Sequence, residues 1–477
     1  MARARPLLST LAVPASVLDT RVQQHALGHR EISLMPKMKK RWSSARLMAG
    51  SLCVAVALSV STWQLRAAED LPTVTPESVG MSSERLQRID DYFQRFIDDN
   101  KIAGAVTLVA RRGKVVHYSA VGSKYREENI PMTTDSIFAL ASMTKPIVST
   151  ALMMLFEEGR FRLDDPISDW IPEYADHMVR ENDGPRQRRV SEARPITIRH
   201  VLTHTSGLTL NANGAGLSEE DRRWVTNDGE PFATLGERVA RAARIPAAFH
   251  PGDHWQYGSS TDYVAVLVEK IAGLSIDTYL KERIFEPLGM RDTFYNVPRD
   301  RVDRVAAMYR PTADGGSALS RAPEFSEPTT YFPGVSGLNS TAADYFRFAQ
   351  MIANGGELDG VRLLGRMTVD LMISNHTDDK SVYIRGDGYG FGLGFGVLVD
   401  PTKSLDTLSP GSYGWGGAFG TLYWGDPAED LIGLMFIQLR GHGPLNIRQR
   451  FTNVVSQAVV DSVADQKPTV RGYAVPQ

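Results

Sequence analysis

One stretch of the sequence decides the fold: Ser142-Met143-Thr144-Lys145-Pro146-Ile147-Val148-Ser149. It opens a strongly apolar run, 142–158, which predicts a central helix, and Pro146 is tolerated in a first turn whose donors have no helical partners. Residues three apart lie on one face of a helix, so the Ser142 hydroxyl and the Lys145 amine can reach each other. Burial at the positive end of a helix favours the neutral amine, which can then take the serine proton. The stretch therefore predicts a Ser–Lys dyad.

Two later segments strengthen this prediction, because Ser-x-x-Lys alone is expected about once by chance in a chain with this many serines. The segment 253–259 reads Asp-His-Trp-Gln-Tyr-Gly-Ser and puts Tyr257 in a glycine-containing loop directly before a helix. The second segment, Trp415-Gly416-Gly417-Ala418, lies in a strand-rich region. The three elements follow one another in an order that indicates a shared site.

The three elements resemble those of the β-lactamase-related serine hydrolases: class C β-lactamases, D-alanyl-D-alanine carboxypeptidases and, most closely, family VIII carboxylesterases. In that family Ser-x-x-Lys supplies nucleophile and base, Tyr-x-Asn or Tyr-x-Ser a second proton carrier, and Lys-Thr-Gly the strand beside the site. The matching residues here are Ser142 with Lys145, Tyr257 with Ser259, and Trp415-Gly416-Gly417. Framework segments 202–208 and 287–290 are also similar, and the resemblance covers roughly residues 75–463.

The third element departs from the lactamase pattern. Trp415 stands where the family has Lys, and Gly416 replaces the hydroxyl-bearing Thr. Family VIII esterases have a similar Trp-Gly-Gly form. Because a cation at this point would bind a substrate carboxylate, we expect the site to have lost that charge and to prefer an uncharged acyl or alcohol group.

The resemblance implies an acyl-enzyme mechanism on Ser142. Lys145 accepts the serine proton, Tyr257 shares this role and returns a proton to the leaving alkoxide, and the principal base of the two stays open. The oxyanion is expected on the backbone N–H groups of Ser142 and Ala418. Gly416 and Gly417 would let the substrate approach the strand edge closely.

Histidines offer two rival sites. His204 follows Thr203 in a predicted turn, but the chain has no Gly-x-Ser-x-Gly elbow, so we interpret it as ordering its loop through hydrogen bonds. The pairs His200/His204 and His250/His254 have i, i+4 spacing without the Glu of His-Glu-x-x-His, and Pro251 breaks the second helix. We therefore predict neither a metal nor another cofactor.

The elements on either side of 142–158 predict the architecture. A helix capped by Ser82 and a hairpin around Arg111-Arg112-Gly113 come before it. Three strand-rich runs, 391–399, 412–424 and 431–439, and a closing helix, 447–463, come near the end. We expect both ends of the chain to build one sheet.

Between them the pattern is helical. It contains a charged insert, 177–194, interpreted as a solvated loop, a helix 261–272 closed by Gly273, and a capping box of Thr341 with Asp344. The predicted fold is α+β and β-lactamase/transpeptidase-like: an antiparallel sheet flanked by helices, with an all-α insertion. The expected segments are a leader 1–68, a sandwich 75–165 with 332–470, and a helical insertion 166–331.

The composition of the chain limits the classes of partner that we expect. The chain has 477 residues and a formal charge of -2, and no basic block lies outside the leader, so nucleic acid is not expected. In the leader, Lys39-Lys40-Arg41 precedes an apolar run, 47–63, and small residues. This is the order of a secretory signal, and its predicted start is Met38. We expect cleavage, no stable membrane insertion and a periplasmic or secreted protein. The single cysteine, Cys53, lies in this leader and excludes cysteine chemistry afterwards.

The sequence therefore predicts a carboxylesterase acting on small or short-acyl esters. The alternatives are a β-lactamase or D-alanyl-D-alanine carboxypeptidase, and a non-catalytic binding relative. The presence of all three proton-handling groups argues against the binding relative. The physiological ester, the choice between ester and amide or between hydrolysis and acyl transfer, the signal cleavage site and the oligomeric state stay open.

Overall fold

The computed structural model describes residues 71–183, 186–213 and 217–461. These residues belong to one compact unit that begins at Ala68. The predicted leader, 1–68, with its start at Met38, lies outside the described residues. The closing helix, predicted to run from 447 to 463, ends at Ser456. Among the helices that are described, none has the length and apolar character needed to cross a membrane.

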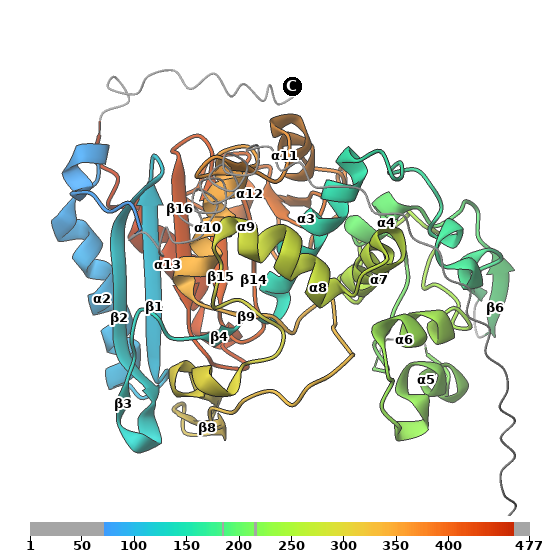
Figure 1. Ribbon diagram of the computed structural model, residues 1–477, viewed down its shortest axis with the longest axis horizontal. Coiled ribbons are helices and arrows are strands. Elements are labelled where there is room, and N and C mark those ends of the chain that lie inside the picture. The colour runs from blue at the N-terminus through green and yellow to red at the C-terminus, as the bar shows by residue number, and fades with distance from the viewer. Residues whose placement is uncertain (1–70, 184–185, 214–216, 462–477) are drawn as a thin grey trace, which may run out of the picture. The chain divides into compact units, whose positions relative to one another are not determined.

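The centre of the unit is an eight-stranded sheet in the order β12-β13-β14-β15-β16-β1-β2-β3. All of its neighbouring strands are antiparallel. Strand β1 joins the two ends of the chain, because it pairs with β2 on one side and with β16 on the other (Figure 1). The prediction of one antiparallel sheet built from both ends is confirmed. The strands are β1 Gly104–Arg111, β2 Lys114–Tyr125, β3 Ile130–Pro131, β12 Tyr389–Phe391, β13 Gly396–Leu398, β14 Tyr413–Gly416, β15 Leu422–Asp426 and β16 Leu431–Phe436.

Helices cover both faces of this sheet. Side chains alternate across a strand, so Val106 and Leu108 of β1 enter one core while Ala105 and Val109 enter the other. The first core contains α3 (Thr144–Glu157) and α10 (Ala342–Ala353). The second core contains α2 (Ser83–Asp98) and α13 (Ile447–Ser456), and Phe93 packs against Phe451 with ring centroids 5.9 Å apart.

The middle of the chain is mainly helical, but two hairpins interrupt the predicted all-α insertion. Strands β5 (Met178–Asp183) and β6 (Arg186–Ser191) pair along their whole length. The prediction of a solvated loop at 177–194 was therefore wrong. The two strands pair through their backbone groups, although their charged residues leave no alternation of apolar side chains in the sequence. The other hairpin joins β7 and β8. The remaining middle elements are α4 Ile198–Leu202, α5 Glu219–Thr226, α6 Leu235–Ala242, α7 Ser260–Ala272, α8 Ile276–Leu280, α9 Glu286–Leu288, β7 Met308–Pro311 and β8 Ser317–Arg321.

Two of the predicted strand runs each contain two strands. The run 391–399 holds the end of β12 and all of β13, joined by a turn in which Gly392 N–H donates to Phe395 O over 2.7 Å. Gly394 in this turn has φ 98°, and any side chain there would collide with Ser149 of α3. The run 412–424 likewise holds β14 and the first part of β15. Short elements complete the fold: β4 Phe138–Ala139, β9 Asn339–Ser340, β10 Glu357–Leu358, β11 Val361–Arg362, α11 Arg366–Met372 and α12 Pro401–Ser404.

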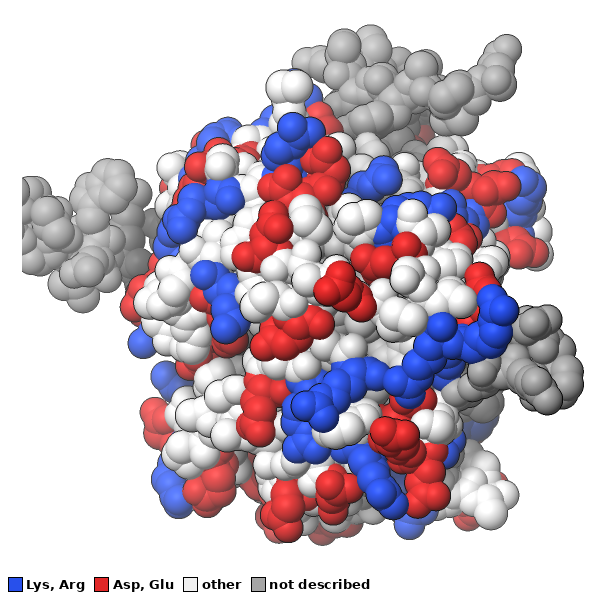
Figure 2. Space-filling model, turned by 90° about the vertical axis from the view of Figure 1, so that its right-hand side faces the viewer, with Lys and Arg blue, Asp and Glu red and all other residues white. Residues whose placement is uncertain are grey.

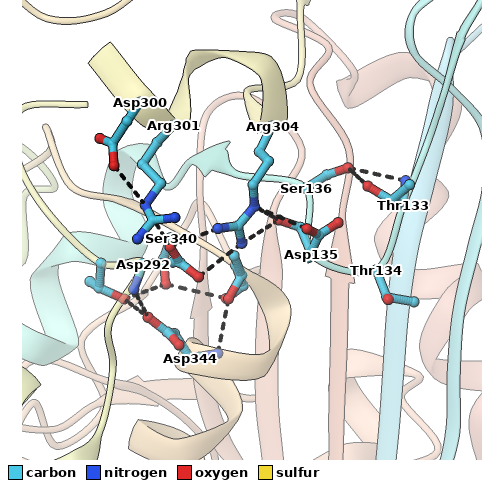
Figure 3. A network of polar contacts seen from close by, with 12 residues as sticks. Thr133, Thr134, Asp135, Ser136, Asp292, Asp300, Arg301, Arg304, Ser340 and Asp344 are labelled. Atoms are coloured by element: carbon cyan, nitrogen blue, oxygen red, sulfur yellow. Dashed lines mark hydrogen bonds and ion pairs between the residues drawn. The ribbon is translucent and has the colours of Figure 1, made fainter. Parts of the chain in front are cut away.

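The start of α10 is tied to the segment that leads into β4. Thr341 caps the helix by accepting from the Asp344 N–H, as predicted. The Asp344 carboxylate does not complete the expected capping box; it accepts from Asp292 N–H over 2.7 Å and from the Thr293 hydroxyl over 2.9 Å. Arg304 extends this network by binding both Asp292 and Asp135 (Figure 3). The network therefore supports the segment that runs from Asp135 through β4 toward Ser142.

Acidic and basic side chains are interspersed on the face that carries α5 and α6 (Figure 2). Arg189 pairs with Asp221 at 3.0 Å, and Arg194 with Asp253 at 2.8 Å. Each of these two arginines is therefore offset by a neighbouring carboxylate.

Candidate active site

Ser142 and Lys145 meet at the junction of two helical segments. Ser142 lies in a short 3-10 turn, Ala141–Met143, directly before α3. The preceding residue, Ala141, has φ 47°, a left-handed conformation that costs free energy for any residue with a Cβ and often marks functional sites. Lys145 is only 2% exposed, and its Nζ donates to Ser142 Oγ over 3.0 Å. The predicted contact between hydroxyl and amine is present.

A second acceptor holds the lysine in place. Lys145 Nζ also donates to the carbonyl of Val335 over 2.9 Å. The N–H of Val335 donates in turn to Asp262 in the first turn of α7, also over 2.9 Å. Burial raises the pKa of Asp262 to about 6, although this hydrogen bond and the Lys145 charge oppose the rise. Asp262 thus acts on the dyad through the backbone of Val335.

Tyr257 completes the site from the loop before α7. Its ring lies 4.8 Å from Lys145 Nζ, measured to the ring centroid. Burial alone would raise the pKa of Tyr257, but the Lys145 charge and hydrogen bonds from Lys145, Ser142 and Trp415 outweigh burial and lower it. The structure therefore brings together all three predicted proton-handling residues and lowers the pKa of Tyr257.

Trp415 is buried against Tyr257 and does not form an open apolar surface. Its side chain is 2% exposed, and its Nε1–H donates to the Tyr257 hydroxyl over 3.2 Å. The two rings lie 5.4 Å apart and are tilted by 48°. The residue at the position of the family's lysine therefore lowers the pKa of Tyr257 through a hydrogen bond.

The glycines after Trp415 make room for protein groups. A Cβ on Gly416 would lie 2.8 Å from Cζ of Arg448, whose guanidinium occupies that space. A Cβ on Gly417 would collide with the Leu140 carbonyl and the Thr421 hydroxyl. Both glycines also line the pocket beside Ser142, and close approach of a substrate to this strand edge stays a prediction.

The expectation that the site has lost its positive charge was also wrong. Arg448 from α13 carries a guanidinium to Gly416, the neighbour of Trp415. Its Nη2 donates to the carbonyls of Gly417 and, over 2.9 Å, Thr421. Trp415 stands where the family has Lys, and a cation from another element lies beside the same strand.

Ala418 follows this braced peptide and is exposed at the rim of the site. A peptide group is planar and almost always trans, so the Ala418 N–H points away from the Gly417 carbonyl that Arg448 holds. Within the described residues, no protein acceptor takes this N–H. It is therefore free to serve as the predicted oxyanion donor.

Ser259 does not join the proton-handling residues. Its hydroxyl accepts from Leu210 N–H over 3.0 Å and holds the neighbouring loop. In the described part of the chain it makes no hydrogen bond to Ser142, Lys145 or Tyr257. Asp253, earlier in the same loop as Tyr257, pairs with Arg194.

The first pair of histidines with metal-like spacing, His200 and His204, is packed into the fold. His200 closes a capping box with Thr197 at the start of α4. His204 is buried, with φ 59°, and its ring packs 5.1 Å from that of Tyr257. Burial, followed by the Lys145 charge, lowers the pKa of His204 well below its usual value, so the ring is neutral. Its Nδ1 has no hydrogen-bond partner, so this ring nitrogen does not order the loop as we had predicted.

A pocket of about 420 Å³ opens beside the site. Ser142, Tyr257 and Ala418 line it together with Arg385 and Arg448. Sequence reasoning missed the two arginines and Asp262. A basic residue at the start of the closing helix was the only available signal for Arg448, and it does not differ from any surface arginine.

Comparison with known proteins identifies the family. The β-lactamase family model matches residues 89–453. The chain is 36% identical to Protein Rv1367c of Mycobacterium tuberculosis, over 72% of this chain and 87% of that one. It is 32% identical to Esterase EstB of Burkholderia gladioli, over 76% of this chain and 93% of that one. Among solved structures, EstCE1, a hydrolase with promiscuous acyltransferase activity, superposes with a TM-score of 0.66 at 26% identity, covering 79% and 99% of the two chains.

The chain therefore belongs to the β-lactamase family. It has the β-lactamase/transpeptidase-like fold, a large antiparallel sheet flanked by helices, and within the family it is a serine hydrolase.

Proposed function

We propose that this protein is a carboxylesterase that cleaves small or short-acyl esters through an acyl-enzyme on Ser142. The observation that carries the proposal is the contact of Lys145 Nζ with Ser142 Oγ at 3.0 Å, beside a tyrosine whose pKa is lowered. The names of EstB and EstCE1 support an ester as the substrate.

In the proposed mechanism Tyr257 is the principal base, and Lys145 stabilises its phenolate. As Ser142 Oγ bonds to the acyl carbon, its proton passes to the Tyr257 oxygen, and the carbonyl electrons move onto the oxygen held by Ser142 and Ala418 N–H. Collapse of this intermediate breaks the bond to the alcohol, and Tyr257 returns the proton to the leaving alkoxide. Water then repeats the sequence and releases the acid from Ser142.

The proposal is tested with a fluorophosphonate probe and p-nitrophenyl esters. The wild-type protein should gain one adduct by intact mass, and Ser142→Ala should gain none and lose ester hydrolysis by about 10⁴-fold or more. Ser149→Ala, a change in the same helix, is the matched control and should still be labelled. Equal labelling of wild type and Ser142→Ala would refute the assignment, and rapid turnover of benzylpenicillin would favour the β-lactamase alternative.

We also propose that the protein is exported and that 75–165 with 332–470 forms the sandwich around the insertion 166–331. The basic, apolar and small-residue order of the leader supports export. N-terminal sequencing of the protein recovered outside the cytoplasm should begin near residue 68; recovery of an intact leader would contradict cleavage.

A further inference from the structure

Lys145 is held by a backbone carbonyl from a distant part of the chain. Its Nζ donates to Val335 O over 2.9 Å and to Ser142 Oγ over 3.0 Å. A lysine side chain is long and flexible, so the place of its Nζ depends on where these two acceptors lie. The contacts that fix Val335 therefore also fix Lys145.

The segment that carries Val335, residues 334–338, is attached at both ends. Its later end meets the nucleophile turn: Leu338 N–H donates to the Thr144 hydroxyl over 3.3 Å, and Leu338 O accepts from Leu140 N–H over 2.9 Å. Its earlier end lies on the first turn of α7, where the Asp262 carboxylate accepts from Val335 N–H over 2.9 Å. Asp262 is therefore the anchor next to the acceptor of the lysine.

Gly334 brings this end of the segment directly against α7. A Cβ at residue 334 would lie 2.2 Å from the carbonyl oxygen of Thr261, so a side chain there would push the segment away from the helix. A backbone hydrogen bond from Gly334 also lowers the pKa of Asp262. The backbone at 334–335 thus rests on the Asp262 carboxylate.

Asp262 is costly to bury, which argues against a purely local role. It is 3% exposed, and within the described residues it forms no ion pair. Burial raises its pKa more than its backbone donors lower it. Desolvating a carboxylate without an ion pair costs free energy, and perturbed carboxylates of this kind gather at functional sites.

We propose that Asp262 is a positioning residue for the dyad: by holding the backbone at 334–335, its carboxylate places Lys145 Nζ against Ser142 and Tyr257. The inference rests on the proposed function, in which these three residues carry out ester cleavage. Asp262 does not line the pocket beside Ser142, so it acts only through Val335 and Lys145. A displacement of Nζ by about 1 Å would slow turnover by up to about 100-fold.

The rival role of Asp262 is to stabilise the start of α7, because a carboxylate in the first turn of a helix interacts favourably with the helix dipole. In that role any loss of activity would follow the loss of folded protein. Glu269 provides a matched control on the same helix. Burial raises the pKa of Glu269, and its carboxylate accepts from Ile276 N–H over 3.0 Å, at the start of α8.

The experiment measures kcat and KM on p-nitrophenyl acetate at equal concentrations of folded protein. Asp262→Ala should lower kcat by about 10- to 100-fold and leave KM within about 2-fold of the wild-type value. Asp262→Asn keeps an oxygen acceptor in the same place and should recover part of the loss. Gly334→Ala, which displaces the same segment while Asp262 is present, should reproduce the loss. Glu269→Ala should keep the wild-type kcat.

Three kinetic results would overturn the positioning role. They are a wild-type kcat in Asp262→Ala, an equal loss of kcat in Glu269→Ala, and no recovery in Asp262→Asn, which would assign the effect to charge. If Asp262→Ala does not fold, Asp262→Asn and Gly334→Ala decide the question: a wild-type kcat in Gly334→Ala would then overturn it.

A crystal structure of Asp262→Ala, or of Gly334→Ala, tests the placement of the lysine without any substrate. The distance from Lys145 Nζ to Val335 O should grow beyond about 3.5 Å, the limit of a hydrogen bond. A contact kept at 2.9 Å would overturn the proposal. Absence of ester cleavage and of fluorophosphonate labelling in the wild type would refute the proposed function, and this distance would still decide whether Asp262 places Lys145.

Discussion

Lys145, Ser142 and Trp415 each lower the pKa of the Tyr257 phenol, which burial would raise. One of them, Trp415 Nε1, lies 3.2 Å away and belongs to a residue 158 positions later in the chain. In the proposed mechanism the phenolate is the active form. The pH at which activity appears should therefore depend on each donor.

Replacing Trp415 by Phe removes the N–H and keeps an aromatic ring. The pKa of Tyr257 should rise, so the acidic limb of the kcat/KM profile should move to higher pH by about half a unit to one unit. The measurement is a pH–rate profile on a neutral p-nitrophenyl ester. Trp424→Phe, in the adjacent strand, is the control, because Trp424 Nε1 is buried without a partner. An unshifted limb in Trp415→Phe would contradict a phenolate base.

At this scale the sequence predicts contacts that follow from helix geometry and misses those that depend on tertiary packing. The Ser142–Lys145 contact joins residues three positions apart and follows from one turn of helix. Arg448 reaches Gly417 across 31 residues, and no local pattern marks it. The expectation of an uncharged site failed for this reason.

Helix α10 carries a buried carboxyl at its N-terminus that makes stability depend on pH. Burial raises the pKa of Asp344 from 3.8 to about 6, and the bonds from Thr293 and Asp292 only partly oppose the rise. A group whose folded-state pKa exceeds its unfolded value binds protons better when folded. Its contribution is favourable below pH 3.8 and is lost as pH rises through 6.

Asp344→Asn should remove this dependence. Relative to the wild type, the variant should gain up to about 3 kcal/mol in unfolding free energy between pH 4 and pH 7. Urea unfolding at both pH values measures the difference, and Asp262, with a similar shift, cancels because both proteins retain it. Asp98→Asn, an exposed change in α2, should follow the wild type. A pH-independent difference between Asp344→Asn and wild type would contradict the raised pKa.

Helices and strands whose apolar residues recur at a regular spacing were predicted from the sequence, and those without such a spacing were not. Helix α2 begins after Ser82 as predicted, because cap and apolar spacing agree. The β5–β6 hairpin was missed because its strands expose arginines and pair through backbone groups, which hydrophobic patterning does not report. The run 391–399 was predicted as one strand-rich run because its turn is made of glycine and apolar residues.

For the molecule as a whole, the sequence predicted that both ends meet in one sheet, and the structure adds what fastens them. Arg111, at the end of β1, is 1% exposed. Its Nη1 donates over 3.0 Å to the carbonyls of Val79 and Gly80 and over 2.8 Å to Asp461, and its Nη2 donates to Glu429 over 2.7 Å. One guanidinium therefore joins the segment before α2, the turn between β15 and β16, and the segment after α13.

Removing the Arg111 side chain should destabilise the whole unit without changing the rate of catalysis. Arg111→Met removes one donor from the carbonyls of Val79, Gly80 and Glu429 and from two carboxylates, a loss of about 3–5 kcal/mol in unfolding free energy. Arg112→Met is the matched control: it also loses a bond to Asp461, of 2.9 Å, but Arg112 is 44% exposed, so it should cost under about 1 kcal/mol. Urea unfolding measures both, and kcat on a p-nitrophenyl ester at 25 °C should stay at the wild-type value because Arg111 does not line the site pocket. Equal losses in the two variants would mean that Arg111 does not fasten the ends of the chain more strongly than a surface ion pair would.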